Sequence, residues 1–422
     1  MHYIFHMNMK SENRIPLSHL YPVIAGCGLV GTCYGMGINI SGNFFTPVAE
    51  TFGIGRGDAA MTLTVYNLVF AFCGLLAPWF HRTFRFRYLM IFGTLLQAGS
   101  TFLLAFCNGI LPMYALNAVR GFGSGIIGSV AVTMMINYWF ARNTALVTSI
   151  AMSFSGITGA VLSPVIASII SAQGWRAAYV FCAAIILILN LPAIVLPISL
   201  HPQERSLAPF GQEEKTETAA DEPERPASSL ALFFLLVFAF ACSVVTALPQ
   251  HFPGIAQWRG AAAAGAFMIS ASMVSNTGGK VLIGVLCDRI GSVKASLLTL
   301  SVITIACAVL FTAGSIPVLI GTAFVYGFCF SVSVVACAVI TRDLFGLARY
   351  SRIFPKVNLM TNAANAVGTW LIGYLYDGSG SYVSSLTLML VLLISAVISL
   401  ILAARLQKNP SSGASSRSFG VE

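Results

Sequence analysis

Apolar runs about as long as a membrane helix follow one another along almost the whole chain. The hydrocarbon core of a bilayer is about 30 Å thick, which a helix crosses in about 20 residues. The runs are continuous, whereas the strands of a membrane β-barrel alternate apolar and polar positions. The pattern therefore predicts an all-α membrane protein with twelve transmembrane helices, at residues 18–46, 58–80, 88–107, 112–138, 144–171, 177–199, 230–250, 263–287, 295–313, 317–341, 357–376 and 383–404.

A polar segment separates the sixth apolar run from the seventh. Residues 200–229 lack apolar periodicity and carry half of the 14 acidic residues of the chain, so we expect a cytoplasmic linker there. This linker divides the chain into a first six-helix half at 1–199 and a second at 230–404. The remaining residues, 405–422, are rich in serine, and we expect them to form a disordered cytoplasmic tail.

Glycines recur at a nearly constant distance between the two halves. Gly74 and Gly284 stand near the ends of the second and eighth runs and are 210 positions apart. Gly159 and Gly368, in the fifth and eleventh runs, are 209 positions apart. Such an offset is typical of a duplicated unit, and parallel repeats related by an axis along the membrane normal are a known transporter plan. We therefore expect two pseudo-symmetric halves.

The composition agrees with a membrane protein, and the distribution of charge orients it. Only 9% of the 422 residues are charged, against about 25% in soluble domains, and the mean hydropathy is +0.83. A net charge of +9 would also suit a nucleic-acid-binding protein. However, eighteen Lys and Arg residues fall in segments expected in the cytoplasm and three in outer loops, which is the positive-inside bias. We therefore expect no nucleic-acid partner, and a multi-pass protein of the inner (plasma) membrane with both termini in the cytoplasm.

No pattern in the sequence indicates an enzyme, a cofactor or a metal site. None of the 10 cysteines forms a Cys-x-x-Cys pair, and nearly all lie inside apolar runs, as small core residues do. The sequence also has no phosphate-binding loop, Ser/His/Asp set or zinc-ligand spacing. We therefore expect a non-enzymatic protein without a cofactor. We also expect it to contact the lipid bilayer and to function as a monomer.

One lysine lies deep inside a predicted span. Lys280 belongs to the eighth run, and a Lys at the centre of a membrane helix costs about 2.5–3.5 kcal/mol on insertion scales. Asn276 precedes it by one helical turn and shares its face. We expect Lys280 to bind an anionic substrate and Asn276 to orient it. The alternative is a lysine that extends toward the inner interface, because Asp288 is only two turns away.

A second cation, Arg120, lies in the fourth run within the sequence Arg-Gly-Phe-Gly-Ser-Gly, whose glycines let other helices approach closely. It is either a second anchor for the anion or a gating residue, or it is a structural arginine bonded to backbone carbonyls. All 14 acidic residues and all 6 histidines lie in loops or at the ends of runs. A buried charge without a partner is costly. The simplest partner for these two cations is a substrate carboxylate that binds and leaves.

Polar residues in two other runs are weaker candidates for the substrate site. The eleventh run carries a polar stripe at helical spacing, made of Asn358, Thr361, Asn362 and Asn365. A membrane helix turns such a stripe toward protein or water rather than lipid. The stripe either lines a cavity, with Asn362 and Asn365 contacting substrate, or joins neighbouring helices. Tyr34 and Asn39 of the glycine-rich first run are further candidates.

In these motifs the chain resembles the major facilitator superfamily. The segment from Gly284 to Lys294 resembles the superfamily's loop motif Gly-x-Leu-x-Asp-Arg-x-Gly-Arg-Arg, and the motif at Arg120 resembles its arginine-bearing fourth helix. The copy of the loop motif in the first half is degenerate, with Pro78 where Asp is expected. The resemblance implies the major facilitator fold of two six-helix halves. It also implies that the loop motif acts as a conformational latch through Gly284, Asp288, Arg289 and Gly291.

Within the superfamily the chain is most similar to the branch of monocarboxylate porters and oxalate–formate antiporters. Asn276-x-x-x-Lys280 resembles the branch's acidic or amide residue followed by Arg in the eighth helix. The segment Gly373–Tyr382 resembles the branch's Gly-x-x-x-Asp-x-Thr-Gly-x-Tyr ending of the eleventh helix. Two departures are that Lys280 replaces the usual Arg and that Asn276 replaces the Asp of proton-coupled members.

The sequence therefore predicts a secondary transporter of a small organic anion, a mono- or dicarboxylate. It would work by alternating access, as an exchanger or as an ion-coupled carrier for which a proton is one candidate ion. Two alternatives remain open. One is an exporter of drugs or other uncharged or cationic solutes, although a proton-coupled exporter would need a membrane carboxylate to titrate. The other is a transporter-like sensor that binds its substrate without turnover.

Overall fold

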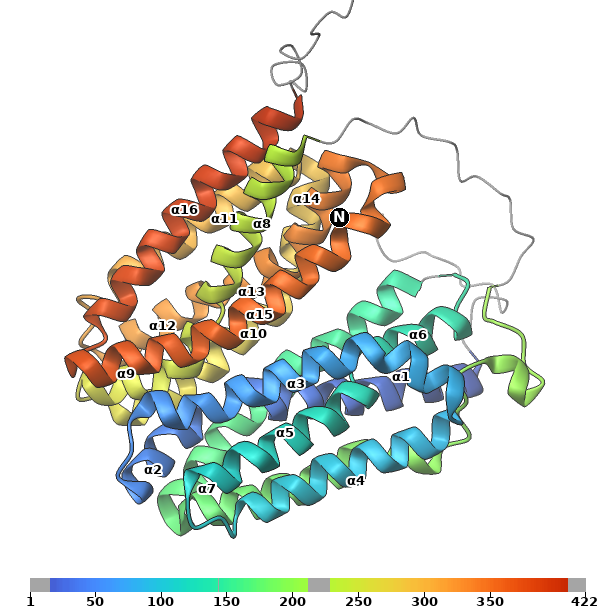
Figure 1. Ribbon diagram of the computed structural model, residues 1–422, viewed down its shortest axis with the longest axis horizontal. Helices are drawn as coiled ribbons and strands as arrows, with labels where there is room; N and C mark the ends of the chain where they lie inside the picture. The colour runs from blue at the N-terminus through green and yellow to red at the C-terminus, as the bar shows by residue number, and fades with distance from the viewer. Residues whose placement is uncertain (1–15, 143, 212–227, 409–422) are drawn as a thin grey trace, which may run out of the picture.

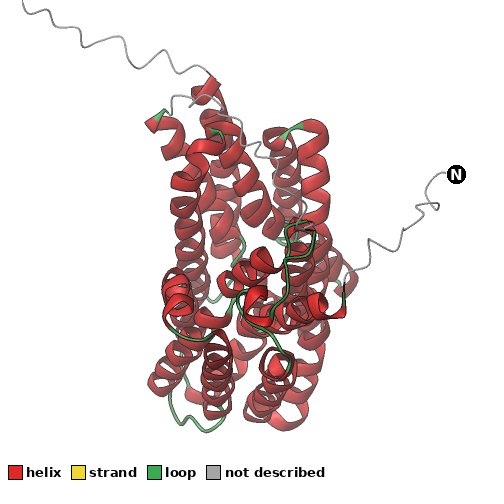
Figure 2. Cartoon of the chain, turned by 90° about the vertical axis from the view of Figure 1, so that its right-hand side faces the viewer, coloured by secondary structure: helices red, strands yellow, loops and turns green. Residues whose placement is uncertain are grey.

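The computed structural model describes residues 16–142, 144–211 and 228–408, which are almost entirely helical (Figure 1, Figure 2). Extended pairing within these ranges is limited to a bridge between Phe140 and Phe210. The last helix continues to Lys408, so 405–408 of the expected tail is helical, and 409–422 lies outside the described residues.

The helices are α1 (Leu17–Val30), η2 (Gly31–Asn39), α2 (Gly42–Phe52), α3 (Arg56–Thr83), α4 (Phe86–Leu104), α5 (Ile110–Ile127), α6 (Ser129–Trp139), α7 (Thr144–Val195), η3 (Pro202–Arg205), α8 (Ser229–Val245), η4 (Leu248–His251), α9 (Phe252–Trp258), η5 (Ala262–Ala264), α10 (Gly265–Ile290), α11 (Ser292–Val309), α12 (Ile316–Tyr326), α13 (Cys329–Ser331), η6 (Val332–Ala336), α14 (Cys337–Phe345), α15 (Leu347–Ser379) and α16 (Val383–Lys408).

Within the described ranges these helices make up twelve membrane spans, which confirms the predicted all-α fold. By length and composition alone, 8 helical stretches qualify as spans. One of them, Leu146–Val195, contains two spans, because Gly174 (φ 85°, ψ 168°) turns the chain back inside α7. The spans that the same criterion leaves out, α4, α10 and α15, run between the same two ends of the molecule (Figure 1).

Large apolar side chains remain exposed along the outside of the spans. Phe72 and Leu75 on α3, Leu95 on α4 and Ile394 on α16 are each more than half exposed. Soluble monomers rarely expose apolar surface on this scale, whereas a bilayer covers it. Together with the length of the helices, this surface identifies a multi-pass membrane protein.

The described helices form two bundles, and each bundle has a hydrophobic core of its own. The first bundle, α1–α7, encloses a core that runs from Ala25 to Leu200. The second, α8–α16, encloses a core that runs from Ala231 to Leu400. The bundles touch mainly along two helix pairs, α3 with α15 and α7 with α10, and also where α2 meets η4 and α9. We propose that they correspond to the two halves that the sequence indicates, 1–199 and 230–404.

The spans run between two ends of the molecule. The linker end holds the start of α1, residues 200–211 and the end of α16. The Asp377 end holds the start of α3, α9 and the end of α15. In Figure 1 the bundles meet where α2, α3 and α9 come together at the Asp377 end, and they diverge toward α6 and α14 at the linker end.

Four predicted spans are interrupted helices. The first passes from α1 through the π-helix η2 to α2, and the fourth breaks at Gly128 between α5 and α6. The seventh contains η4 between α8 and α9, and the tenth contains the π-helix η6 between α13 and α14. Hydropathy does not predict these breaks, because an irregular turn can bury the same apolar side chains as a regular α-helical turn. Irregular backbone at membrane depth is tolerated where protein or water surrounds it, and π-helical turns are frequent at functional sites.

The beginning of the predicted linker packs against the first bundle. Ala141 N–H donates to Phe210 O at 2.9 Å, next to the bridge between Phe140 and Phe210. Residues 200–211 are therefore attached to the end of α6 rather than separate from the bundle. The acidic part of the linker, 212–227, lies outside the described residues.

The packing of α1 against α7 depends on a glycine. A Cβ atom on Gly28 would lie 1.9 Å from the carbonyl oxygen of Leu189, a backbone atom that cannot rotate away. We predict that Gly28→Ala destabilises the protein by about 1–3 kcal/mol, as overpacking of a core does. The measurement is the unfolding temperature of the purified protein in detergent.

The matched control is Gly99→Ala on α4. This glycine is exposed, and an added Cβ would have nothing within 4 Å. Because Ala favours a helix over Gly by about 0.8–1 kcal/mol, the control should keep or raise the unfolding temperature. Equal effects of the two substitutions would contradict the close approach at Gly28.

Candidate functional site

Contacts between α7 and α10 extend from the Asp377 end to about the middle of the two helices. Ser270 Oγ on α10 donates to Ala160 O on α7 at 2.7 Å. One turn further along α7 toward the linker end, a Cβ on Gly156 would lie 2.1 Å from Thr277 Oγ1 of α10. Past Thr277, no hydrogen bond between described residues joins these two helices. Beyond this depth the two bundles diverge toward the linker end (Figure 1).

Lys280 lies on α10 one turn beyond the last of these contacts, toward the linker end. Its helix face is the one that carries Thr277 and Met273, and both pack on the first bundle, Met273 with its Cγ 3.0 Å from where a Cβ on Gly159 would stand. The Lys280 side chain is half-buried, and within the described ranges it has no hydrogen bond or ion pair. A positive charge therefore sits on the face of α10 turned toward the first bundle, at the depth where the bundles separate.

Asn276 lies one turn before Lys280 and has an acceptor without a partner. The residue is 3% exposed, and its Nδ2 lies 3.8 Å from Met273 Sδ, which is a weak acceptor. Its Oδ1 has no hydrogen-bond partner among the described residues. Leaving a buried polar atom unsatisfied costs about 1–3 kcal/mol. Asn276 and Lys280 thus form a polar pair on one helix face with unused hydrogen-bonding capacity.

The described acidic side chains do not supply a counter-charge for this pair. Each of them is exposed and lies in a loop or near the end of a helix, namely Glu50, Asp58, Glu204, Asp288, Asp343 and Asp377. The expectation that no carboxylate lies inside a span therefore holds for this part of the chain. The positive charge at membrane depth has no resident anion beside it there.

Arg120, on α5, is only 5% exposed and is held inside the first bundle. Its Nη2 donates to Met36 O in η2 at 2.9 Å, and its guanidinium carbon lies 5.2 Å from the centroid of the Tyr66 ring. Tyr66 OH donates in turn to Cys33 O of the same π-helix at 2.7 Å. These contacts are those of a structural arginine, which satisfies a backbone carbonyl in the interrupted first span. Arg120 Nε, however, has no partner among the described residues.

Tyr34 and Asn39 both belong to η2. The hydroxyl of the half-buried Tyr34 lies 2.7 Å from Ser129 Oγ at the start of α6. Asn39 is buried and donates from Nδ2 to Ser155 O on α7 at 2.9 Å. Asn39 also packs on Gly159, the glycine that Met273 of the second bundle contacts. The structure therefore brings Asn39 to the junction of the two bundles.

The polar stripe of the eleventh span joins helices at Asn365. Asn365 Oδ1 accepts from Asn67 Nδ2 on α3 at 3.2 Å, and its Nδ2 donates to Thr246 Oγ1 at 2.9 Å. Asn362 is half-buried and donates to Asn358 O one turn earlier on its own helix, at 2.8 Å. Sequence reasoning missed Asn67 and Thr246, because a single polar residue in an apolar run gives no sign of a partner from a distant span.

The turn after α10, where we expect a latch, is not bonded to the first bundle. Asp288 and Arg289 are exposed, and no hydrogen bond or ion pair joins either side chain to the described residues of that bundle. Gly291 (φ 87°, ψ 148°) makes the turn into α11, a conformation that favours glycine. A Cβ on Gly284 would have nothing within 4 Å.

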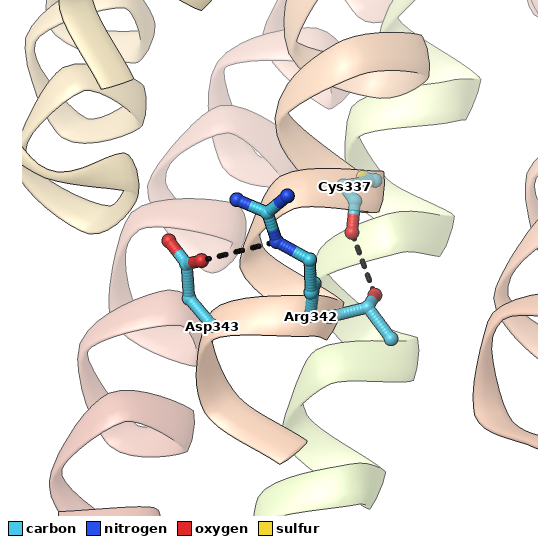
Figure 3. Close-up of polar contacts among 4 residues, drawn as sticks. Cys337, Arg342 and Asp343 are labelled. Atoms are coloured by element: carbon cyan, nitrogen blue, oxygen red, sulfur yellow. Dashed lines mark hydrogen bonds and ion pairs between the residues drawn. The ribbon is translucent and has the colours of Figure 1, made fainter. Parts of the chain in front are cut away.

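At the end of α14 the polar side-chain contacts that are drawn in Figure 3 stay within the helix. Arg342 Nε lies 3.8 Å from Asp343 Oδ1, with both side chains exposed, and Thr341 Oγ1 donates to Cys337 O at 2.6 Å. Both contacts are local to α14. An exposed ion pair contributes about 0–1 kcal/mol, so this one does little to fix the linker end.

Comparison with known proteins gives a family and a fold. The sequence profile of the Major Facilitator Superfamily matches residues 27–292 and 252–420. Monocarboxylate transporter 12-B of Danio rerio is 26% identical over 213 residues, which are 49% of this chain and 44% of that protein. A probable sulfoacetate transporter of Cupriavidus necator is 25% identical over 139 residues, 33% of this chain and 32% of that protein. Each of these matches spans less than half of the relative's length.

The crystal structure of a D-xylose-proton symporter shares the architecture. It superposes with a TM-score of 0.67 at 15% sequence identity, and the match covers 91% of this chain and 97% of that one. At this identity the likeness concerns the fold alone. The family profile, in contrast, extends over both bundles. The chain therefore belongs to the Major Facilitator Superfamily, and it is a membrane transporter rather than an enzyme.

Proposed function

We propose that the protein transports a small organic anion, a mono- or dicarboxylate, and that Lys280 binds the carboxylate. The observation that carries this proposal is the half-buried ammonium of Lys280, without a partner among the described residues, beside the unsatisfied Oδ1 of Asn276. A carboxylate accepts charge-assisted hydrogen bonds from Lys, and a hydroxyl or a second, protonated group on the same substrate donates to an amide oxygen. The pair thus suits a small anion that also carries a donor.

The names of the two relatives support the same chemistry. One is called a monocarboxylate transporter and the other a probable sulfoacetate transporter. Monocarboxylates and sulfoacetate have a carboxylate in common, and sulfoacetate has a second anionic group. Arg120, whose Nε is open, is our candidate for a second charge toward such a group. Tyr34, Asn39 and Asn362 are candidates for polar contacts around the anion.

We propose alternating access as the mechanism, with the two bundles rocking about the contact between α7 and α10. Gly156 and Gly159 lie at that contact, so little side-chain bulk opposes a change of angle. A bound carboxylate neutralises Lys280, which lowers the cost of enclosing this charge when the bundles close over it. The loaded carrier should then reorient more readily than the empty one. This favours exchange or symport, with a proton as one candidate co-ion, over leak.

The orientation follows from the exposed cations, which we propose lie in the cytoplasm. Arg82, Arg85 and Arg87 around the turn from α3 to α4, and Arg289 and Lys294 around the turn after α10, are all exposed at the linker end. This distribution supports a linker end and termini on the cytoplasmic side of the inner (plasma) membrane. During rocking, Asn365 would lose its bond to Asn67 of the first bundle. The Asp288 turn, which has no hydrogen bond or ion pair with the described residues of that bundle, would gain contacts with it.

The Lys280 assignment predicts opposite effects on transport and on stability. Lys280→Met should lower the apparent affinity for the carboxylate about 10- to 100-fold, the value of a charge-assisted hydrogen bond. It should also raise the unfolding temperature of the substrate-free protein, because a charge without a partner is removed from the interior. Uptake in proteoliposomes and thermal unfolding measure the two effects.

Lys294→Met, which removes an exposed lysine from the start of α11, is the matched control and should change neither quantity. Lys280→Arg, which keeps the charge, should retain part of the uptake. Full uptake by Lys280→Met would contradict the assignment. A loss of stability in that variant would indicate a structural lysine instead.

A competition panel tests the substrate class against the two alternatives. Small carboxylates and sulfoacetate should compete with a labelled carboxylate, while the neutral amides of the same acids should not. Repeating the panel with and without a proton gradient shows whether a proton is the co-ion. Competition by lipophilic cations, with none by carboxylates, would favour an exporter of uncharged or cationic solutes. Saturable binding of a carboxylate without uptake or counterflow would favour a sensor.

A further inference from the structure

Each oxygen of the Asp377 carboxylate accepts a hydrogen bond from a backbone amide at the start of α3. Oδ1 accepts from Arg56 N at 2.7 Å, and Oδ2 accepts from Gly57 N at 2.7 Å. The first amides of a helix have no partner within the helix and carry a partial positive charge. Because Asp377 belongs to the second bundle and α3 to the first, this carboxylate caps a helix of the opposite bundle.

Glycines on both sides make room for the cap. A Cβ on Gly55 would lie 2.4 Å from Asp377 Oδ2, and one on Gly57 would lie 2.9 Å from Tyr374 N. From the other side, a Cβ on Gly373 would lie 2.8 Å from Gly57 Cα. A side chain at Gly57 or Gly373 would push α3 and α15 apart, and one at Gly55 would displace the Asp377 carboxylate. The backbones of the two bundles thus fit together only because these residues are glycine.

Arg56 adds further contacts from the first bundle to the second. Its Nη1 lies 3.4 Å from Gly254 O and 3.3 Å from Tyr382 OH, and its Nη2 donates to Gln257 Oε1. Its guanidinium carbon lies 4.4 Å from the centroid of the Tyr376 ring. One residue of the first bundle therefore reaches α9, the end of α15 and the turn before α16.

We infer that the Asp377 cap is a latch, which holds the two bundles together at the Asp377 end and must release before the alternative conformation forms. The latch gives a role to the segment Gly373–Tyr382, which carries the aspartate, the close-approach glycine and the tyrosine that meet α3. It goes beyond the proposed carboxylate transport and does not depend on which solute is carried.

The state of the linker end supports this role. Asp288 has no hydrogen bond or ion pair with the described residues of the first bundle, whereas both carboxylate oxygens of Asp377 accept hydrogen bonds from it. The two carboxylates lie at opposite ends of the molecule, on either side of the contact between Gly156 and Thr277. Rocking about this contact that brings the linker ends together therefore pulls Asp377 away from Arg56 and Gly57.

Spin-label distances in the full-length protein test the latch without any substrate. One pair of labels, at Ala172→Cys and Ala263→Cys, spans the Asp377 end, where both alanines are exposed. A second pair, at Thr83→Cys and Lys294→Cys, spans the linker end, where both residues are exposed. The native cysteines are all buried, so thiol labels should react mainly with the introduced ones.

We expect Asp377→Ala to raise the ratio of long to short distances at the Asp377 end about tenfold, as loss of a charge-assisted bond does. The distances at the linker end should shorten in the same variant. Asp377→Asn keeps the shape of the side chain, but its amide NH2 would face a backbone N–H that also donates. This variant should therefore change both label distances in the same directions as Asp377→Ala, but by less. The control is Asp58→Ala, one residue from the capped amides. The Asp58 side chain has no hydrogen bond or ion pair with the described residues of the second bundle, so this variant should leave both distances unchanged.

Gly373→Ala tests the same latch without changing any charge. Its Cβ should hold the bundles apart and lengthen the distance at the Asp377 end, whereas Gly378→Ala, on the same helix with nothing within 4 Å of an added Cβ, should not. Unchanged distances in both Asp377→Ala and Gly373→Ala would overturn the inference. So would a lengthening at the Asp377 end with no change at the linker end, because this would be local fraying rather than rocking. Neither outcome would bear on the identity of the substrate.

Discussion

A positive charge inside a membrane span needs a partner, because removing an ion from water costs several kcal/mol even after the protein relaxes. Lys280 carries such a charge, and in the described part of the chain no hydrogen bond or ion pair offsets the cost. The acidic side chains described there are all exposed. Buried Asn276 adds an acceptor that is likewise unsatisfied. A protein that leaves this pair open in one conformation gains most from a solute that closes it, which is the physical basis for proposing an anionic substrate.

The position of this pair follows from how the bundles meet. Small residues bring α7 and α10 into contact from the Asp377 end to Gly156, and the contacts stop just before Lys280. At the Asp377 end, the exposed carboxylate of Asp377 and the half-buried Arg56 bind groups of the opposite bundle. Polar contacts between the bundles are thus concentrated on one side of the pair. The pair lies at the boundary between the joined and the diverging parts of the two bundles.

Hydropathy and charge predict the twelve spans, because bilayer thickness and the positive-inside bias act on every residue of a run. The same signals give no warning of the π-helices η2 and η6, since a wider helical turn buries the same side chains. Lys280 could be found from sequence because a lone cation stands out in an apolar run. The partners of Arg120 and Asn365 could not, because they come from spans far away in the chain. Asp377 was visible only as part of a motif, because its partners are backbone amides, which any sequence provides.

The central claim is that the ammonium group of Lys280 is neutralised by the carboxylate of the transported solute. The most direct measurement is an experimental structure of the protein with a transported carboxylate bound. The account predicts carboxylate oxygens about 2.7–2.9 Å from Lys280 Nζ, with Asn276 in contact with the same molecule. A carboxylate bound elsewhere while Lys280 pairs with a resident group of the protein would contradict it.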